Sequence, residues 1–310
     1  MEQPFASEWS GRIRQVEIGA TKNEGGTRQK TYRVGGRTNL PFLEGAQEKP
    51  LVALEICDDP KFWSSIVLSY TGDVTEDAGT WAREVEVTYG ADLVRLYLTS
   101  TRRKEFQDMA SLRQTIENVL QSTGLPLIIE GSHEPSMDSE VFRICGEAAA
   151  GERALLGTAE SDRYRSVAAA ALAYGHSVIA QSPIDINLAK QLNILLHEID
   201  VPPDRIVMDP YTGTLGYGFE YSYSVMERIR TAALKGDTDL AMPMISSAID
   251  SLNVKEVREA PQDVRDEMAI MWEYYAALSA AVAGAEIVCV RHPRTVGRLQ
   301  ETFQRLVGAA

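Results

Sequence analysis

The residues best suited to bind a cofactor or another protein lie in one stretch, residues 206–230, which reads IVMDPYTGTLGYGFEYSYSVMERIR. Its three glycines fall within six positions, so the backbone can adopt left-handed conformations and approach another surface closely. Five aromatic residues share the segment: Tyr211, Tyr217, Phe219, Tyr221 and Tyr223. Because aromatic area left in water is lost binding area, we expect this segment to bury a ligand or a partner.

Motifs of the common catalytic and metal centres do not occur in the sequence. It contains four histidines (His133, His176, His197 and His292) and three cysteines (Cys57, Cys145 and Cys289). The histidines lack a metal-ligand spacing such as H-E-x-x-H, and an iron–sulfur cluster normally takes four thiolates. The cysteines are therefore interpreted as small buried residues. G-x-S-x-G and Walker sequences are also missing, so we predict no catalytic residue and no metal site in this chain.

The elements that must position the 206–230 stretch follow a strand–helix alternation. Predicted strands cover residues 51–56, 93–98, 127–129, 154–157, 177–180, 206–208, 240–245 and 287–290. Between them, apolar residues recur at three- and four-residue spacing, which is typical of helices. Eight such units over about 260 residues predict a TIM (β/α)₈ barrel. A doubly wound sheet is the alternative, but its nucleotide loop would need glycines after the first strand, where residues 55–60 read EICDDP.

Residues 1–45 differ from the barrel pattern. Segments 12–18 and 28–34 alternate between apolar and polar residues around the polar turn 22–26, which predicts a β-hairpin. We therefore divide the chain into an N-terminal extension with this hairpin, residues 1–45, and a barrel, residues 46–310. Pro243 falls inside the seventh predicted strand and lacks an N–H group, so a bulge or distortion is expected there.

Functional residues of such barrels follow the carboxyl ends of the strands. Here these positions hold Glu55, Asp58, Asp59, Thr99, Ser100, Thr101, Glu130, Ser132, Gln181, Ser182, Asp209, Tyr211, Thr212, Ser246, Ser247, Arg291 and His292. The set is rich in hydroxyls and carboxylates and poor in cations, which favours a docking surface over a hydrolase or a sugar-phosphate enzyme. Asp209 precedes Pro210, so turn capping is favoured over a role in an acid–base pair, and Asp58 and Asp59 are expected to face water.

The charge composition of the chain argues against some classes of binding partner. The 310 residues include 44 acidic and 31 basic side chains, which give a formal charge of −13. Such a surface repels phosphate backbones and anionic lipids, so nucleic acid and membranes are not expected as partners. No apolar run approaches the roughly 20 residues of a membrane span, and the first residues do not read as a signal peptide. We expect a cytoplasmic protein.

The run from Met208 to Arg230 resembles the small subunit of the corrinoid iron–sulfur protein, which is also called the delta subunit of the acetyl-CoA decarbonylase/synthase complex. The supporting segments are residues 51–56 (LVALEI), residues 236–245 and the N-terminal hairpin. Together they span nearly the whole chain, and the long motif is specific.

The resemblance implies a heterodimer with a large subunit that carries a [4Fe–4S] cluster and a mobile corrinoid-binding domain. Such a pair accepts a methyl group from methyl-tetrahydrofolate, through a separate methyltransferase, on cobalt. It delivers the methyl group to acetyl-CoA synthase in the reductive acetyl-CoA (Wood–Ljungdahl) pathway. In this interpretation the present chain is a non-catalytic subunit that binds no cofactor alone and covers the corrinoid (cobalamin) at the interface with the large subunit.

The candidate corrinoid-contacting residues belong to one loop: Asp209, Tyr211, Thr212, Gly213, Leu215, Gly216, Tyr217 and Gly218. In the helix that follows, we expect Tyr221 to face the core and Tyr223 to be free for interaction. The alternative is a pterin-binding methyltransferase barrel that acts directly on methyl-tetrahydrofolate. Such barrels hold the pterin with Asp and Asn at strand ends, whereas the third and fifth strands here end at Glu130 and Gln181.

Overall fold

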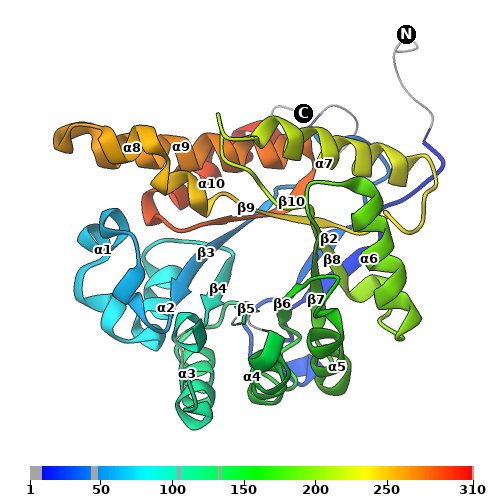
Figure 1. The fold of residues 1–310 in the computed structure, drawn as a ribbon, viewed down its shortest axis with the longest axis horizontal. Coiled ribbons are helices and arrows are strands. Elements are labelled where there is room, and N and C mark those ends of the chain that lie inside the picture. Colours follow the sequence, from blue (N-terminus) through cyan, green and yellow to red (C-terminus); the bar gives the residue numbers. More distant parts are fainter. Residues whose placement is uncertain (1–8, 43–47, 103–105, 132, 134, 309–310) are drawn as a thin grey trace.

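A closed barrel of eight parallel strands forms the centre of the protein, which we describe from a computed structural model covering residues 9–42, 48–102, 106–131, 133 and 135–308 (Figure 1). Its strands are hydrogen-bonded in the order β10-β3-β4-β5-β6-β7-β8-β9. Their bounds are β3 (Leu51–Cys57), β4 (Leu93–Tyr97), β5 (Leu127–Glu130), β6 (Leu155–Ala159), β7 (Ser177–Gln181), β8 (Ile206–Asp209), β9 (Met244–Ser247) and β10 (Ala285–Val290). The predicted TIM barrel is confirmed.

The predicted position of the seventh strand, residues 240–245, was wrong. Strand β9 begins at Met244, so Pro243 lies before the strand rather than inside it. Proline has no N–H for the ladder, and here its carbonyl accepts a hydrogen bond from Met208 N at 2.8 Å. Strands β8 and β9 then pair only at Met208 and Met244. The irregularity in this part of the barrel lies between β9 and β10, whose register shifts between Ala285 and Ile287.

Helices alternate with the strands and surround the barrel (Figure 1). They are α1 (Ser65–Thr71), α2 (Ala78–Val87), α3 (Met109–Ser122), α4 (Pro135–Ala148), α5 (Tyr164–Tyr174), α6 (Ile186–Glu198), α7 (Phe219–Leu234), α8 (Lys255–Glu259), α9 (Gln262–Ala283) and α10 (Pro293–Gly308). Aspartates cap several of them: the side chain of Asp185, for example, accepts hydrogen bonds from two backbone N–H groups of α6. None of the helices in the described part of the chain has the length and hydropathy that a membrane span requires.

The N-terminal hairpin closes the amino-terminal end of the barrel. Strands β1 (Gln15–Ile18) and β2 (Tyr32–Gly35) pair antiparallel, as predicted, over fewer residues than expected. Val16, Ile18 and Val34 are buried in one cluster with inward-facing residues of all eight barrel strands. A buried ion pair of 2.7 Å between Arg28 and Glu152 ties the hairpin to the barrel. The division at residues 45 and 46 falls in a segment, 43–47, outside the described residues and stays a prediction.

The buried face of α7 differs from the prediction by one residue position. Tyr221 is 65% exposed, whereas Tyr223 is half-buried and its ring centroid lies 6.3 Å from that of Phe219. The helix begins at Phe219, and its core-facing stripe continues through Ser222 and Met226. Since adjacent helical positions are rotated by about 100°, a stripe through Ser222 leaves Tyr221 facing outward.

Candidate functional site

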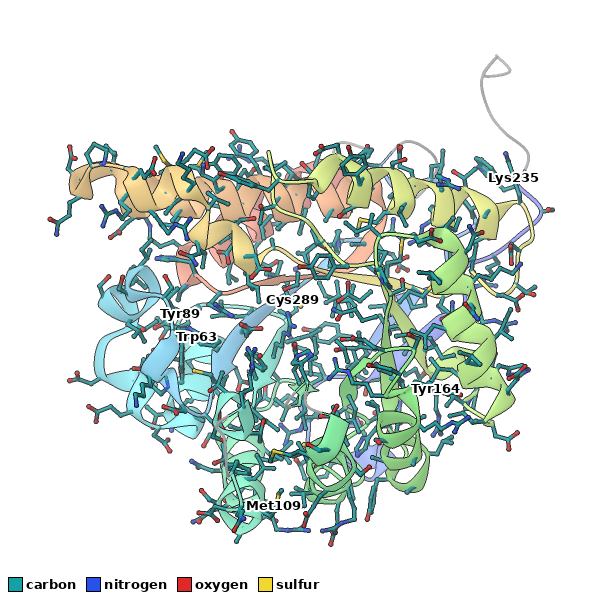
Figure 2. The ribbon with its side chains drawn as sticks, in the orientation of Figure 1. Trp63, Tyr89, Met109, Tyr164, Lys235 and Cys289 are labelled. Atoms are coloured by element: carbon teal, nitrogen blue, oxygen red, sulfur yellow. The ribbon has the colours of Figure 1, made fainter. Side chains whose placement is uncertain are left out.

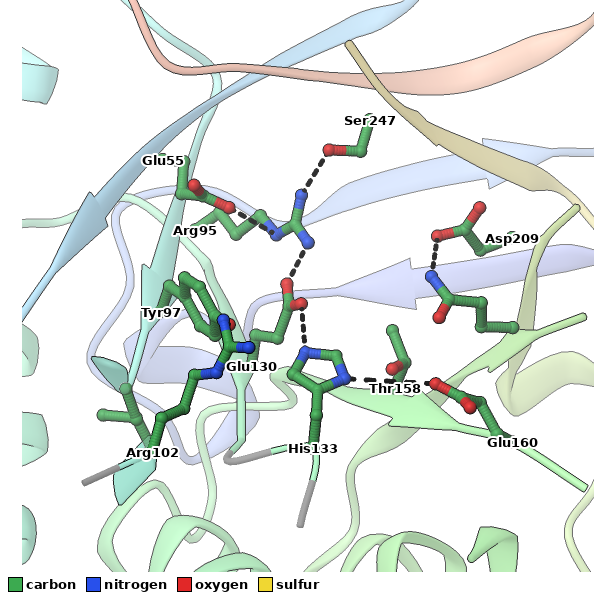
Figure 3. A network of polar contacts seen from close by, with 12 residues as sticks. Glu55, Arg95, Tyr97, Arg102, Glu130, His133, Thr158, Glu160, Asp209 and Ser247 are labelled. Atoms are coloured by element: carbon green, nitrogen blue, oxygen red, sulfur yellow. Dashed lines mark hydrogen bonds and ion pairs between the residues drawn. The ribbon is translucent and has the colours of Figure 1, made fainter. Parts of the chain in front are cut away.

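Arg95 occupies the barrel lumen at the carboxyl ends of the strands (Figure 3). Its Nη1 donates to Ser247 Oγ at 2.8 Å, and its guanidinium forms ion pairs with Glu130 and with Glu55, the latter at 3.2 Å between Nε and Oε2. One side chain thus joins strands β3, β4, β5 and β9. Burial alone would lower the pKa of Arg95, but the two carboxylates raise it above its usual value, so the guanidinium stays charged.

The network continues from Glu130 to the loops after β5 and β6. His133 Nε2 lies 2.7 Å from Glu130 Oε1, and His133 Nδ1 lies 2.8 Å from Arg163 Nη2. Because arginine can only donate, this geometry has Nδ1 as the acceptor and the Nε2–H donating to Glu130. Burial opposes protonation, but the hydrogen bond to Glu130 and the nearby Glu160 carboxylate raise the pKa of His133 to about 9. The acceptor role of Nδ1 therefore belongs to the neutral ring; in the protonated ring Nδ1 carries a hydrogen and cannot accept from Arg163, and Glu160 Oε1 lies 3.9 Å from it.

On the opposite side of the lumen, Asp209 organises the start of the loop. Its Oδ1 accepts a hydrogen bond from Tyr211 N at 2.9 Å, and its Oδ2 accepts one from Gln181 Nε2 at 3.0 Å. The predicted capping role of Asp209 is therefore confirmed. Burial raises the pKa of Asp209, and the hydrogen bond from Gln181 opposes that shift. Beside it, the hydroxyls of Thr212 and Ser246 lie 2.7 Å apart, which ties the loop to β9.

The outer part of the loop is exposed at the barrel mouth. The Tyr211 side chain is 46% exposed on a backbone with φ of +59°, and Tyr217 is 49% exposed. Tyr217 OH donates to Glu256 Oε2 of α8 at 2.9 Å. Gly216, with φ of +78°, lies against Trp272 of α9, since a Cβ at this glycine would be 3.6 Å from that ring. Helices α8 and α9 thus hold the loop in place.

The eight predicted site residues therefore divide into two groups. Asp209 and Thr212 are buried and hold the loop. Six more are half-buried or exposed: Tyr211, Gly213, Leu215, Gly216, Tyr217 and Gly218. Whether any of them contacts a corrinoid stays a prediction.

The expectation of a cation-poor mouth is wrong. Arg95 and Arg163 are buried there, and Arg291 pairs with Glu55 at 2.8 Å while stacking 3.8 Å from the Trp63 ring centroid. The prediction considered only residues that follow a strand, whereas Arg95 points inward from within β4. A charged residue in the middle of the apolar run LVRLY was the signal that could have revealed it.

Asp58, expected to face water, is instead bonded within the mouth. Its Oδ1 accepts hydrogen bonds from Thr99 Oγ1 at 2.9 Å and Ser100 N at 3.0 Å. Asp59 caps a short 3₁₀ helix, where its side chain accepts from Lys61 N. Ser132, also predicted at the mouth, lies outside the described residues.

All three cysteines are buried, as predicted, and Cys289 lies in the interior of the barrel (Figure 2). Burial raises the pKa of the Cys289 thiol to about 12, so it stays protonated and unreactive. Within the described ranges, no group of three or more His, Cys, Asp or Glu side chains is arranged to hold a metal ion.

Solved structures that resemble this chain include dihydropteroate synthases. The enzyme from Xanthomonas albilineans, in complex with 7,8-dihydropteroate, superposes with a TM-score of 0.59 at 18% identity, over 84% of this chain and 94% of that one. The enzyme from Coxiella burnetii, in complex with pteroic acid, has a TM-score of 0.59 at 14% identity, over 90% of this chain and 97% of that one. At these identities the likeness shows the fold alone.

Sequence comparison is more specific. The acetyl-CoA decarbonylase/synthase complex subunit delta of Archaeoglobus fulgidus is 36% identical over 320 residues, which cover 99% of this chain and 71% of the relative. The subunit delta of Methanopyrus kandleri is 35% identical over 300 residues, which cover 95% and 75%. The family model of the CO dehydrogenase/acetyl-CoA synthase delta subunit matches residues 15–288. The chain therefore belongs to the CO dehydrogenase/acetyl-CoA synthase delta subunit family.

Proposed function

We propose that this chain is the small subunit of the corrinoid iron–sulfur protein, a methyl carrier. Its large-subunit partner would hold the corrinoid and a [4Fe–4S] cluster, and the present barrel would cover the corrinoid at their interface. The methyl group would come from methyl-tetrahydrofolate through a separate methyltransferase and pass to acetyl-CoA synthase, in the cytoplasm. Membership of the delta subunit family supports this proposal.

The main observation in support of the proposal is that side chains already fill the barrel mouth. Arg95 and its partners Glu55, Glu130 and Ser247 fill the lumen with ion pairs and hydrogen bonds among themselves (Figure 3). Opening this space for a ligand would leave buried charges unpaired, which costs several kcal/mol. A ligand is therefore better accommodated on top of the mouth than inside it.

The loop above this filled mouth suits the covering of a large flat macrocycle. Tyr211 and Tyr217 expose their rings, Gly216 between them is exposed, and Gly218 beside Tyr217 is half-buried. Aromatic faces and backbone N–H groups match a ring system with an apolar face and amide-bearing edges. When bound by the partner, the corrinoid supplies a cobalt(I) nucleophile that is easily oxidised. The residues of this chain would exclude water and oxygen from it.

The test is the oxidation rate of the cobalt(I) corrinoid in the two-subunit complex, followed by its visible spectrum. Tyr217→Ala removes one exposed ring and its hydrogen bond to Glu256. We expect faster oxidation and weaker binding between the subunits. Tyr70→Ala is the matched control, because Tyr70 is also 49% exposed but lies on α1. Unchanged oxidation and complex formation for a combined Tyr211→Ala and Tyr217→Ala variant would disprove the covering role.

The pterin-binding alternative makes the opposite prediction for the isolated chain. A methyltransferase barrel would bind methyl-tetrahydrofolate tightly in its mouth. The lumen network predicts no tight binding, because Arg95 already occupies that space. Calorimetric titration of the isolated chain with methyl-tetrahydrofolate separates the two functions.

A further inference from the structure

A groove of about 810 Å³ opens beside the site loop, and of its lining residues only Tyr211 takes part in the proposed covering role. It lies between the loop after β6, the loop after β7 and helix α6, and Tyr211 forms part of its edge. One wall is apolar and consists of Ile184, Leu188, Leu192 and Leu195. Leu188 is 44% exposed, so part of this wall is open to solvent.

The polar groups of the groove include one that the fold leaves without a partner. Ser182 is 4% exposed, and its Oγ makes no hydrogen bond to the part of the chain that the structure describes. Its backbone N–H, by contrast, donates to Asp209 O at 2.9 Å. Because an unpaired buried hydroxyl destabilises a folded chain, the position of Ser182 is better explained by a ligand that bonds to it.

The charged side chains at the edge of the groove restrict the net charge of that ligand. Glu160 and Asp162 lie on it, so an anion would be repelled. Inside that edge the groove offers an apolar wall and a neutral hydroxyl, against which burying a full positive charge costs free energy. A neutral group that can both donate an N–H and accept a hydrogen bond, on a short apolar arm, fits these constraints. A primary carboxamide has both functions.

Tyr211 adds a second, independent indication of a ligand. Its φ of +59° is strained for a residue with a Cβ, and Asp209 holds the backbone there through the bond to Tyr211 N. The strain holds a half-exposed ring at the edge of the groove, where the isolated chain gains little from it. Pre-organising a contact residue reduces the entropy lost when a ligand binds.

We infer that this groove, which combines the unpaired Ser182 hydroxyl, the wall of α6 and the strained Tyr211, binds a primary carboxamide on a short apolar arm. The inference rests on the proposed function and extends it. Two sources carry this group: the amide arms at the rim of a corrinoid, and an asparagine or glutamine side chain of the partner subunit. Both would place their carboxamide next to Ser182 Oγ.

The decisive variant is Ser182→Ala, for which a binding role and a structural role predict opposite results. Removing an unpaired buried hydroxyl should raise the Tm of the free chain, while ligand affinity should fall about ten-fold, the worth of one hydrogen bond. Leu188→Arg should weaken binding as well. Leu172→Arg is its matched control, because Leu172 is 37% exposed on α5 and does not line the groove. A lower Tm with unchanged affinity for Ser182→Ala would show a purely structural serine and overturn the inference.

Two titrations of the full chain identify the source of the carboxamide. Cobinamide carries amide arms, and cobyrinic acid carries carboxylates at the same positions of the same macrocycle. At about 0.5 M salt, which screens the acidic surface, cobinamide should bind more tightly, and only its binding should respond to Ser182→Ala. If that variant instead weakens only the binding of the large subunit, the partner supplies the group.

If neither binding changes, the groove inference is wrong. The covering role is tested separately, by the cobalt(I) oxidation rates of the Tyr211 and Tyr217 variants.

Discussion

The two ends of the barrel lumen are closed in different ways. At the amino-terminal end, Val16, Ile18 and Val34 of the hairpin form an apolar plug, and each is at most 3% exposed. At the carboxyl end, Arg95 and the carboxylates around it close the lumen with charge. Apolar burial stabilises directly, by roughly 25 cal/mol per Å². Buried ion pairs gain little overall because desolvation offsets their attraction. The plug thus contributes stability directly, whereas the charged end adds little net stability.

The strongest test of this difference is Arg95→Met, which leaves Glu55 and Glu130 buried without their shared partner. We expect the free energy of unfolding to fall by about 3–5 kcal/mol, measured by urea denaturation. The triple variant Glu55→Leu, Arg95→Met, Glu130→Leu should recover part of that loss, because it removes these three buried charges together and leaves only the partly exposed Arg291 and His133 without these carboxylates. A triple variant less stable than Arg95→Met alone would show that the network itself stabilises the barrel.

The second largest effect on stability is expected for a substitution in the apolar plug. Ile18→Ala removes buried methyl groups from the centre of the cluster, so the free energy of unfolding should fall by about 3 kcal/mol. Binding of the large subunit and cobalt(I) oxidation should stay unchanged once the variant is folded, because the plug is at the opposite end of the barrel from the mouth. Tm and the oxidation rate measure the two properties. A folded Ile18→Ala variant with a faster oxidation rate would contradict the separation of roles.

A smaller effect concerns His292, which follows Arg291 at the charged end. Its Nδ1 accepts from Arg294 N at the start of α10, and burial lowers the pKa of His292 to about 4. The unfolded chain therefore binds this proton first, and the contribution of His292 to stability falls as the pH drops from 6.5 toward 4, by about 2 kcal/mol between pH 6.5 and 5. His292→Asn keeps a cap acceptor but does not titrate, so this loss should disappear from urea denaturation curves.

Glu273 gives the matching control for that pH profile. It accepts hydrogen bonds from Arg291 N and His292 N, and burial raises its pKa to about 7. The folded chain binds this proton more tightly than the unfolded chain. The contribution of Glu273 to stability therefore falls as the pH rises from about 4.5 to 7. In His292→Asn this opposite slope should remain, and Glu273→Gln should remove it. Because the two contributions oppose each other in the wild type, the test is the difference between profiles: a His292→Asn profile parallel to that of the wild type would exclude a contribution from His292.

The sequence predicted the barrel well because periodicity determines it. Strands 51–56 and 206–208 lie within β3 and β8, and the hairpin pairs as expected. Asp209 was assigned correctly because its turn chemistry is local. The lumen network was missed because ion pairs such as Arg95 with Glu130 join residues far apart in sequence. The orientation of Tyr221 was missed because it depends on the residue at which α7 begins, Phe219.

The position of the hairpin has a consequence for how the protein is made. Val16 and Ile18 are synthesised before every strand of the barrel, yet the cluster that buries them includes Ile287 and Cys289 of β10. The ribosome must therefore translate more than 250 further residues before the plug can be completed. During that time the apolar side chains of the nascent hairpin lack their native partners, and contacts this distant in sequence form slowly. Chaperone dependence during synthesis should accordingly decrease when Val16 and Ile18 are made polar, even though the finished barrel would be less stable.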